Sequence, residues 1–309
     1  MPTLIKKLNA VLTLGRVSNL PTVWTNCIAA WILNQLGSGL SLFVLPESGD
    51  TQPIDLGISN LLWIVIGSSL IYVAGTTIND AFDVEYDRKY NQGRPIPSGV
   101  MKTWEVWLIG VTEFAIGFYI LLDFVGVNLV YLILLCAVII AYDAVHKKWS
   151  GSVWLMGGCR LFLWWTIASA SMSAESSLSN LVYVWSITLL LYIAGITFVA
   201  RGEATGRLPS FPWPFFFLFS PVLLGAFFCF YYSKWLVIPI ILLLGLGVLR
   251  GVRFAKSKGS GIGKGVALWL ALITVADALA ISLVDPLLGY CMLLGFPLCL
   301  WTQKYFAAT

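Results

Sequence analysis

Long apolar stretches separated by short polar connections make up most of the chain. A helix needs about 20 apolar residues to cross the hydrocarbon core of a bilayer. The pattern therefore predicts an all-α fold, a polytopic membrane bundle of nine or ten transmembrane helices. The expected spans are residues 18–36, 56–78, 103–122, 127–142, 153–171, 180–200, 211–232, 235–249, 265–284 and, as a tenth, 286–301.

Composition supports the membrane interpretation. Of 309 residues, 59% are hydrophobic and 11% are charged, and the mean hydropathy is +0.86. Soluble proteins carry about 25% charged residues, so we expect an integral membrane protein with one membrane domain over residues 1–309. Residues 1–16 lack the apolar core of a signal peptide and are expected to form a cytosolic amphipathic lead-in.

Two function classes are disfavoured by the placement of basic residues and cysteines. The net charge of +4 comes from basic residues in short loops between spans, which does not favour nucleic-acid binding. The cysteines lie in apolar surroundings without a CxxC pair, so they predict neither a metal site nor a disulfide framework. These residues are Cys27, Cys136, Cys159, Cys229, Cys291 and Cys299.

The distribution of Lys and Arg predicts the orientation in the membrane, because cytosolic loops collect these residues. The loops expected to be cytosolic are basic, and they are residues 79–102, 143–152, 200–210 and 250–264. The opposite loops carry acids but no Lys or Arg, and they are residues 37–55, 123–126, 172–179 and 284–286. The N-terminus is then cytosolic, and one cytosolic site could draw on all four basic loops.

The densest polar segment follows the second expected span, at residues 79–99. Asn79, Asp83 and Asp87 recur every four residues, so a helix that continues for two turns projects all three from one face. Asp80 lies on the flank of that face. Crowded oxygen ligands without His or thiolate partners favour Mg²⁺, which readily shares its coordination shell with phosphate.

Basic residues follow these carboxylates directly. Arg88 and Arg94 are of the type that grips phosphate, so the segment predicts a diphosphate held through metal ions. The alternative is that charges at the end of a membrane helix only form a solvated cap. The complete pattern, NDxxDxxxDR followed by RPIPSG, is far more specific than an isolated DxxxD.

A second, weaker pattern indicates internal duplication. A span that ends in a polar motif occurs at residues 79–88 and again at 200–207, and a helical hairpin and a basic loop follow in each case. The pattern predicts two related halves that face each other around a central cavity.

Three other polar residues are candidates considered singly. Asn26 and Asp277 lie inside expected spans, where polar groups are costly and often functional. Each could contact a substrate or could instead hydrogen-bond a neighbouring helix. The single histidine, His146, lies in a loop and is expected to be solvated rather than catalytic.

The motifs together resemble the UbiA superfamily of intramembrane prenyltransferases over most of the chain. NDAFDVEYDR at residues 79–88 is similar to the family's first Asp-rich motif, and RPIPSG resembles the segment after it. GRVSNLPTVWTN, at residues 15–26, resembles the entry to the first helix. GGCR, at residues 157–160, resembles a Gly-rich segment with its arginine. Tyr142 and Lys147 lie where the family often has a tyrosine and then Lys-Arg.

The resemblance implies transfer of a prenyl group from a prenyl diphosphate to an aromatic or otherwise lipophilic acceptor, with Mg²⁺ as cofactor and membrane lipid as surroundings. It implies catalytic roles for Asp83, Asp87 and Glu203. These three, with Asn79 and Asp80, would bind the metal. Asn26 and Asp277 would line the substrate pocket. The residues that would bind the diphosphate are Arg88, Arg94, Tyr142, Lys147, Arg160 and Arg201.

The second motif departs from the family pattern. The family usually supplies two aspartates in a DxxxD arrangement, whereas residues 200–207 read ARGEATGR, with Glu203 as the single carboxylate. Arg201 and Arg207 could take over part of the diphosphate charge. The alternative is a non-catalytic UbiA-like membrane protein that binds or transports an isoprenoid or lipid. A CDP-alcohol phosphotransferase is disfavoured because its DGxxAR signature is absent.

Overall fold

The computed structural model describes residues 4–37, 58–171, 177–203, 206–257 and 260–305. Within these ranges the regular structure is helical, and no strand occurs. The α-helices are α1 Leu4–Leu14, α2 Leu20–Gly37, α3 Ile58–Phe82, α4 Val84–Tyr90, α5 Thr103–Tyr119, α6 Leu129–Val145, α7 Ser152–Ala168, α8 Asn180–Ala200, α9 Trp213–Phe217, α10 Ser220–Tyr231, α11 Ile238–Ala255, α12 Gly261–Ala271, α13 Ile273–Ser282, α14 Pro286–Met292 and α15 Gly295–Tyr305.

Six helical stretches in the described residues are long and apolar enough to cross a membrane, which confirms a polytopic helical membrane protein. They are Ser59–Phe82, Thr103–Val125, Asn180–Ala200, Trp235–Ala255, Gly261–Ser282 and Pro286–Tyr305. Two shorter apolar helices are Leu129–Val145 and Ser220–Tyr231. The expected spans at 18–36 and 153–171 correspond to α2 and α7. The total of nine or ten spans stays a prediction.

The expected span at residues 211–232 is divided in two, as are those at 265–284 (α12 and α13) and 286–301 (α14 and α15). Residues 211–232 form α9 and α10 rather than one helix. Pro221 lies in the first turn of α10. Proline has no backbone N–H and its ring clashes with the preceding turn, so it is tolerated at a helix start but interrupts a helix interior. The sequence WPFFFLFSP therefore favours a break before residue 220.

Several helix starts follow capping residues that the sequence contains. The Asn128 side chain accepts a hydrogen bond from the Val130 backbone N–H at 2.9 Å before α6. Ser179 similarly caps α8, and Asp285 caps α14 by accepting from Leu288 at 3.0 Å. These side chains satisfy backbone donors that the first turn of a helix leaves unpaired.

The bundle interior is formed by helices that are apolar on all sides. Every residue of α13 is buried, and 83% of an apolar 18-residue segment within Gly261–Ser282 is buried, against 22% of such a segment within Thr103–Val125. A helix that is hydrophobic all round belongs inside a protein or membrane. The α13 helix packs on α2, which in turn packs on α7 and α3. Helices α5 and α11 lie outside and expose large apolar side chains on the surface of the bundle.

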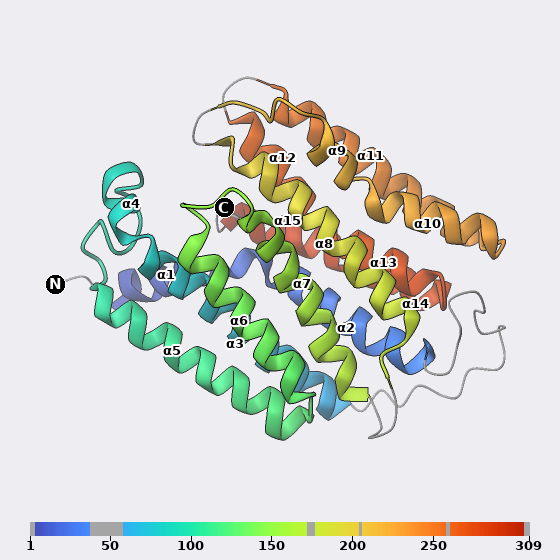
Figure 1. Cartoon of the computed structure of the whole chain (residues 1–309), viewed down its shortest axis with the longest axis horizontal. Helices are drawn as coiled ribbons and strands as arrows, with labels where there is room; N and C mark the ends of the chain where they lie inside the picture. The colour runs from blue at the N-terminus through green and yellow to red at the C-terminus, as the bar shows by residue number, and fades with distance from the viewer. Residues whose placement is uncertain (1–3, 38–57, 172–176, 204–205, 258–259, 306–309) are drawn as a thin grey trace.

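The chain path brings the basic connections together (Figure 1). Helix α4, the α6–α7 connection, the end of α8 and the start of α12 lie toward one end of the bundle, while α14 and the α10–α11 connection lie toward the other. This arrangement agrees with the predicted grouping of the four basic loops. Which membrane side they face stays a prediction.

Close helix packing depends on Gly157 in α7. A Cβ atom at this position would lie 2.6 Å from the Leu190 carbonyl oxygen of α8, which is too close for any real contact. Because the obstacle is backbone, it cannot move aside as a side-chain tip could. Gly245 in α11 differs, since its nearest neighbour would be a Val222 methyl at 3.8 Å.

We predict that Gly157→Ala destabilises the protein by roughly 1–3 kcal/mol through overpacking between α7 and α8. Gly245→Ala, the matched control, is expected to be neutral or slightly stabilising because alanine favours helix. Thermal unfolding of both purified variants in detergent measures the difference. Equal unfolding temperatures would show that α7 and α8 are not packed this closely.

Candidate functional site

The Asp-rich segment begins at a bend between two helices. Helix α3 ends at Phe82, Asp83 precedes α4, and the Asp83 backbone has φ −84° and ψ 3°. The backbone hydrogen bonds nevertheless continue across the bend. The Asp83 N–H donates to the Asn79 carbonyl at 3.0 Å, and the Asp87 N–H donates to the Asp83 carbonyl at 2.8 Å. The predicted four-residue spacing is therefore kept.

The four side chains expected to bind metal in this segment are buried. Asn79, Asp80, Asp83 and Asp87 have exposed fractions of 3–8%. A buried carboxylate is costly unless it is paired and hydrogen-bonded. The structure meets this requirement by placing basic or amide side chains against the carboxylates, so the segment is more than a solvated cap.

Asp80 is paired with two arginines from different parts of the chain. The Arg94 guanidinium donates a hydrogen bond to Asp80 Oδ1 through Nη1. Arg16, directly before the first expected span, approaches the same oxygen with its Nη2 atom at 3.8 Å. Arg16 also donates to Asn79 Oδ1 at 3.4 Å. Its backbone is left-handed, with φ 43° and ψ 47°.

Asp83 is paired with two basic groups from the α6–α7 connection. His146 Nε2 lies 3.1 Å and Lys147 Nζ 3.3 Å from Asp83 Oδ2. Burial alone raises the pKa of the Asp83 carboxyl, but these partners outweigh it and hold the pKa below its usual range. The expectation of a solvated His146 is wrong, since its side chain is 11% exposed and it faces the carboxylate. The loop folds back onto the bend.

Asp143 is a site residue that the sequence reasoning missed. Its Oδ1 accepts a hydrogen bond from Asn79 Nδ2 at 2.9 Å. Its Oδ2 is buried and has no hydrogen-bond partner in the described parts of the chain. The signal that could have found it is an acid directly after Tyr142, in the last turn of α6 and just ahead of a basic connection. Tyr142 itself stacks on the His146 ring, with centroids 5.0 Å apart.

The remaining residues of the Asp-rich segment divide between the inner and outer sides of α4. Asp87 accepts a hydrogen bond from Asn91 Nδ2 at 2.7 Å. Arg88 is exposed, as is Glu85. Arg88, which was predicted to bind the diphosphate, therefore lies on the outer surface of α4.

Arg201 and Glu203 lie where α8 ends. Arg201 Nη2 donates to the carbonyls of His146 at 3.0 Å and Trp149 at 2.8 Å, and to Ser152 Oγ at 2.7 Å. Arg201 thus fastens the loop whose His146 contacts Asp83. The Glu203 carboxylate lies against Gly263 of α12, and partial burial raises its pKa. Their predicted roles toward diphosphate and metal stay predictions.

A second polar cluster lies inside the bundle. Asn26 of α2 contacts both Asp277 of α13, at 2.7 Å, and Arg160 of α7, at 3.0 Å. Arg160 Nη2 also donates to Thr22 Oγ1 at 3.0 Å. Three residues predicted separately from the sequence are therefore joined in one chain of hydrogen bonds.

The oxygen donors of the Asp-rich segment suit a Mg²⁺ ion whose coordination shell is completed by a phosphate. Among the residues that the structure describes, no three His, Cys, Asp or Glu side chains converge as a metal cage. Mg²⁺ needs about one or two carboxylates when waters and substrate phosphates complete its octahedron. Asp80, Asp83 and Asp87 offer this oxygen chemistry, whereas a closed all-protein cage is not formed.

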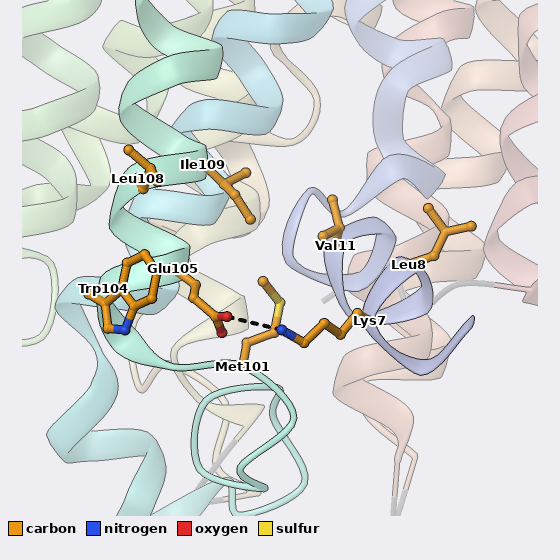
Figure 2. Close-up of a pocket in the computed structure, with 8 residues that line it drawn as sticks. All are labelled: Lys7, Leu8, Val11, Met101, Trp104, Glu105, Leu108 and Ile109. Atoms are coloured by element: carbon orange, nitrogen blue, oxygen red, sulfur yellow. Dashed lines mark hydrogen bonds and ion pairs between the residues drawn. The ribbon is translucent and has the colours of Figure 1, made fainter. Parts of the chain in front are cut away.

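A hollow of about 410 Å³ lies elsewhere. It is found between α1 and the first turns of α5 (Figure 2). Its walls are mostly apolar, and the Lys7–Glu105 ion pair, at 3.0 Å, crosses it. None of the predicted site residues lines it. We therefore assign the candidate chemistry to the carboxylate cluster, and the central cavity expected between the halves stays a prediction.

These features define an all-helical membrane protein with paired carboxylates and basic groups at one end of its bundle. The model of the UbiA prenyltransferase family matches residues 39–261, which is more than half of the chain. The chain therefore belongs to the UbiA prenyltransferase family, and the resemblance inferred from the motifs is confirmed. The match includes Arg160 but neither Asn26 nor Asp277.

Individual relatives match over shorter stretches. The chain is 37% identical over 97 residues to digeranylgeranylglyceryl phosphate synthase of Pyrococcus horikoshii, covering 31% of each protein. It is 31% identical over 96 residues to the same synthase of Methanosarcina barkeri, covering 30% of this chain and 33% of the relative. The alignments thus span about a third of the curated relatives.

A solved structure supports the fold over nearly the full length. It is titled "Structural and mechanistic insights into the biosynthesis of Digeranylgeranylglyceryl phosphate synthase in membranes". The likeness covers 96% of both chains, with a TM-score of 0.53 and 19% sequence identity. At this identity the likeness shows the fold alone.

We predict strong energetic coupling between Asp80 and Arg94, because breaking a buried pair leaves an uncompensated charge. A double-mutant cycle with Asp80→Asn and Arg94→Gln should give a coupling of roughly 1–3 kcal/mol in the free energy of unfolding. The more exposed pair Lys7 and Glu105, tested with Lys7→Gln and Glu105→Gln, should give a much smaller coupling. Equal couplings would contradict the pairing described here.

Proposed function

We propose that this protein is a membrane prenyltransferase that moves a prenyl group from a prenyl diphosphate to a lipophilic acceptor. The observation that carries the proposal is the set of buried carboxylates, each beside a basic or amide side chain, at one end of a membrane bundle. Membership of the UbiA prenyltransferase family supports the reaction class.

The carboxylates serve as the anchor for the diphosphate end of the substrate. Asn79, Asp80, Asp83 and Asp87 are the residues that would hold Mg²⁺ together with the diphosphate oxygens. When bound, the metal would supply positive charge that stabilises the departing diphosphate. Glu203, from the second motif, is a further metal ligand in this proposal, and its carboxylate lies against Gly263 of α12.

The basic residues serve as direct donors to the diphosphate. Arg94, His146 and Lys147 each contact a carboxylate of the Asp-rich segment. A diphosphate beside them offers a second set of anionic oxygens within reach of the same N–H groups. Charge-assisted hydrogen bonds of this kind are short and strong. Arg88, Tyr142, Arg160 and Arg201 complete the proposed set.

The reaction needs charge stabilisation and exclusion of water. The prenyl C–O bond breaks with its electron pair going to the diphosphate, and the allylic carbocation that remains bonds to a nucleophilic atom of the acceptor, which then loses a proton. Donors fixed where negative charge develops lower this barrier. A membrane interior keeps water from the cation, and aromatic faces can stabilise it.

The acceptor and the topology are parts of the same proposal. The relatives named above are synthases of digeranylgeranylglyceryl phosphate, so a glyceryl phosphate lipid joins aromatic compounds as an acceptor to be tested. We further propose a single membrane domain of nine or ten spans with a cytosolic N-terminus and cytosolic active-site loops, on the charge distribution of the sequence.

A non-catalytic role in isoprenoid binding or transport is the second candidate. One observation favours it: Glu203 is the single carboxylate of the second motif and lies against Gly263, without two further ligating side chains in the described residues. Such a protein would bind prenyl diphosphates saturably without releasing pyrophosphate.

We predict Mg²⁺-dependent pyrophosphate release from geranylgeranyl diphosphate by the purified protein in the presence of its acceptor. Asp83→Asn and Asp87→Asn should each lower the rate by roughly 100-fold or more, because charge stabilisation at the reacting bond is lost. Glu85→Gln is the matched control, since Glu85 is an exposed acid on the same short helix. It should retain nearly full activity.

The measurement combines pyrophosphate release with mass spectrometry of the lipid products, over aromatic and glyceryl phosphate acceptors. Saturable binding without release across the whole acceptor panel supports the non-catalytic candidate. Binding that is no tighter with Mg²⁺ than with a chelator contradicts the proposed anchoring of the diphosphate by the carboxylates.

A further inference from the structure

Asp277 is buried in the middle of the bundle and its carboxylate is fully occupied. The side chain has an exposed fraction of 0%. Its Oδ2 accepts from Thr25 Oγ1 at 2.6 Å, and both of its oxygens accept from Asn26 Nδ2 at 2.7 Å. Because these two α2 side chains enclose the Asp277 carboxylate, it contacts them rather than a substrate.

The contact with Asp277 fixes which way the Asn26 amide points. A guanidinium only donates hydrogen bonds, so it needs the amide oxygen of Asn26 rather than the amide nitrogen. The amide nitrogen of Asn26 must therefore face Asp277, and its oxygen must face Arg160, whose Nη1 donates to Oδ1 at 3.0 Å. The amide links an acid and a base that form no ion pair with each other in the described residues.

Hydrogen bonds to α2 hold one side of the Arg160 guanidinium, and its other side is available to bind a ligand. It donates to Asn26, to the Thr22 carbonyl at 3.4 Å and to Thr22 Oγ1 at 3.0 Å. A guanidinium has five N–H groups. Two of those of Arg160 therefore donate no hydrogen bond to the residues that the structure describes. Its side chain is partly buried, and its central carbon lies 5.8 Å from the centre of the Tyr72 ring of α3.

The position along α3 relates Arg160 to the carboxylate cluster. Tyr72 precedes Asn79 by two helical turns, which correspond to roughly 10 Å along the helix axis. Arg160 therefore lies deeper in the bundle than the Asp-rich segment and beside the same helix. A fixed arginine at this depth suits the anionic end of a substrate that enters past Asn79.

We infer that Asp277 is a positioning residue, which acts through Asn26 to orient the Arg160 guanidinium toward the diphosphate of the prenyl substrate. The inference rests on the proposed function and adds a residue outside the family match, which ends at residue 261. Asp277 itself does not touch the substrate. Its role is carried by its capacity to accept hydrogen bonds from Asn26.

The test compares two variants that both lack the Asp277 charge. Asp277→Asn retains an acceptor for Asn26 Nδ2, whereas Asp277→Leu has a similar size and no acceptor. Because neither variant carries a charge at residue 277, any difference between them reports the hydrogen bonds that this position accepts from Asn26 and Thr25. We expect the Leu variant to bind geranylgeranyl thiodiphosphate about 10-fold more weakly than the Asn variant, as for one hydrogen bond to a charged network.

The dependence on Arg160 is measured by repeating the comparison in the Arg160→Gln background. The Asn and Leu variants should then bind within about 2-fold of each other, because the group that Asp277 orients is gone. Thr274→Val is the matched control on α13: Thr274 is equally buried, but its hydroxyl donates to the Ala271 carbonyl, at the end of α12, at 2.8 Å. It should leave the affinity unchanged.

Equal affinity of the Asn and Leu variants, or a difference that persists without Arg160, overturns the inference. If the Leu variant does not fold, Asp277→Ser against Asp277→Ala provides the same acceptor comparison. Failure of the unmodified protein to bind geranylgeranyl thiodiphosphate or inorganic pyrophosphate with Mg²⁺ instead contradicts the proposed function. Ligand binding by the unmodified protein therefore distinguishes failure of the proposed function from failure of the inference about Asp277.

Discussion

The structure depends on the pairing of buried charge at the end of α3. Asp80 and Asp83 are nearly inaccessible to solvent, and neither could remain ionised there without a partner. Their partners come from three places: Arg16 before α2, Arg94 after α4, and the His146–Lys147 segment after α6. One electrostatic requirement therefore fixes the relative positions of segments that are far apart in the sequence.

The same principle operates a second time, deeper in the bundle. Asp277 on α13 and Arg160 on α7 are joined through Asn26 on α2. Helices α2 and α13 are mostly apolar, so shape and area alone would leave their rotation and register loosely defined. Directional hydrogen bonds supply what nonspecific burial lacks, because a polar group in an apolar interior has few acceptable positions.

The local features of the chain could be predicted from sequence, and the long-range pairings could not. Apolar length located the helices, and the spacing of Asn79, Asp83 and Asp87 survived a bend that the pattern did not indicate. His146 was expected to be solvated because a loop position says nothing of what the loop packs against. Arg16 and Asp143 were missed for the same reason: a side chain is defined as part of a site by neighbours that lie 63 or 64 residues away.

Arg16 has two structural roles, one in its backbone conformation and one in its side chain. Its left-handed backbone, with φ 43°, turns the chain from α1 into α2, and glycine would adopt that shape more easily. Glycine, however, has no guanidinium to reach Asn79 and Asp80. The residue that connects α1 to the bundle is therefore also a partner of the carboxylate cluster. A change in the angle of α1 would also move the Arg16 charge relative to Asp80.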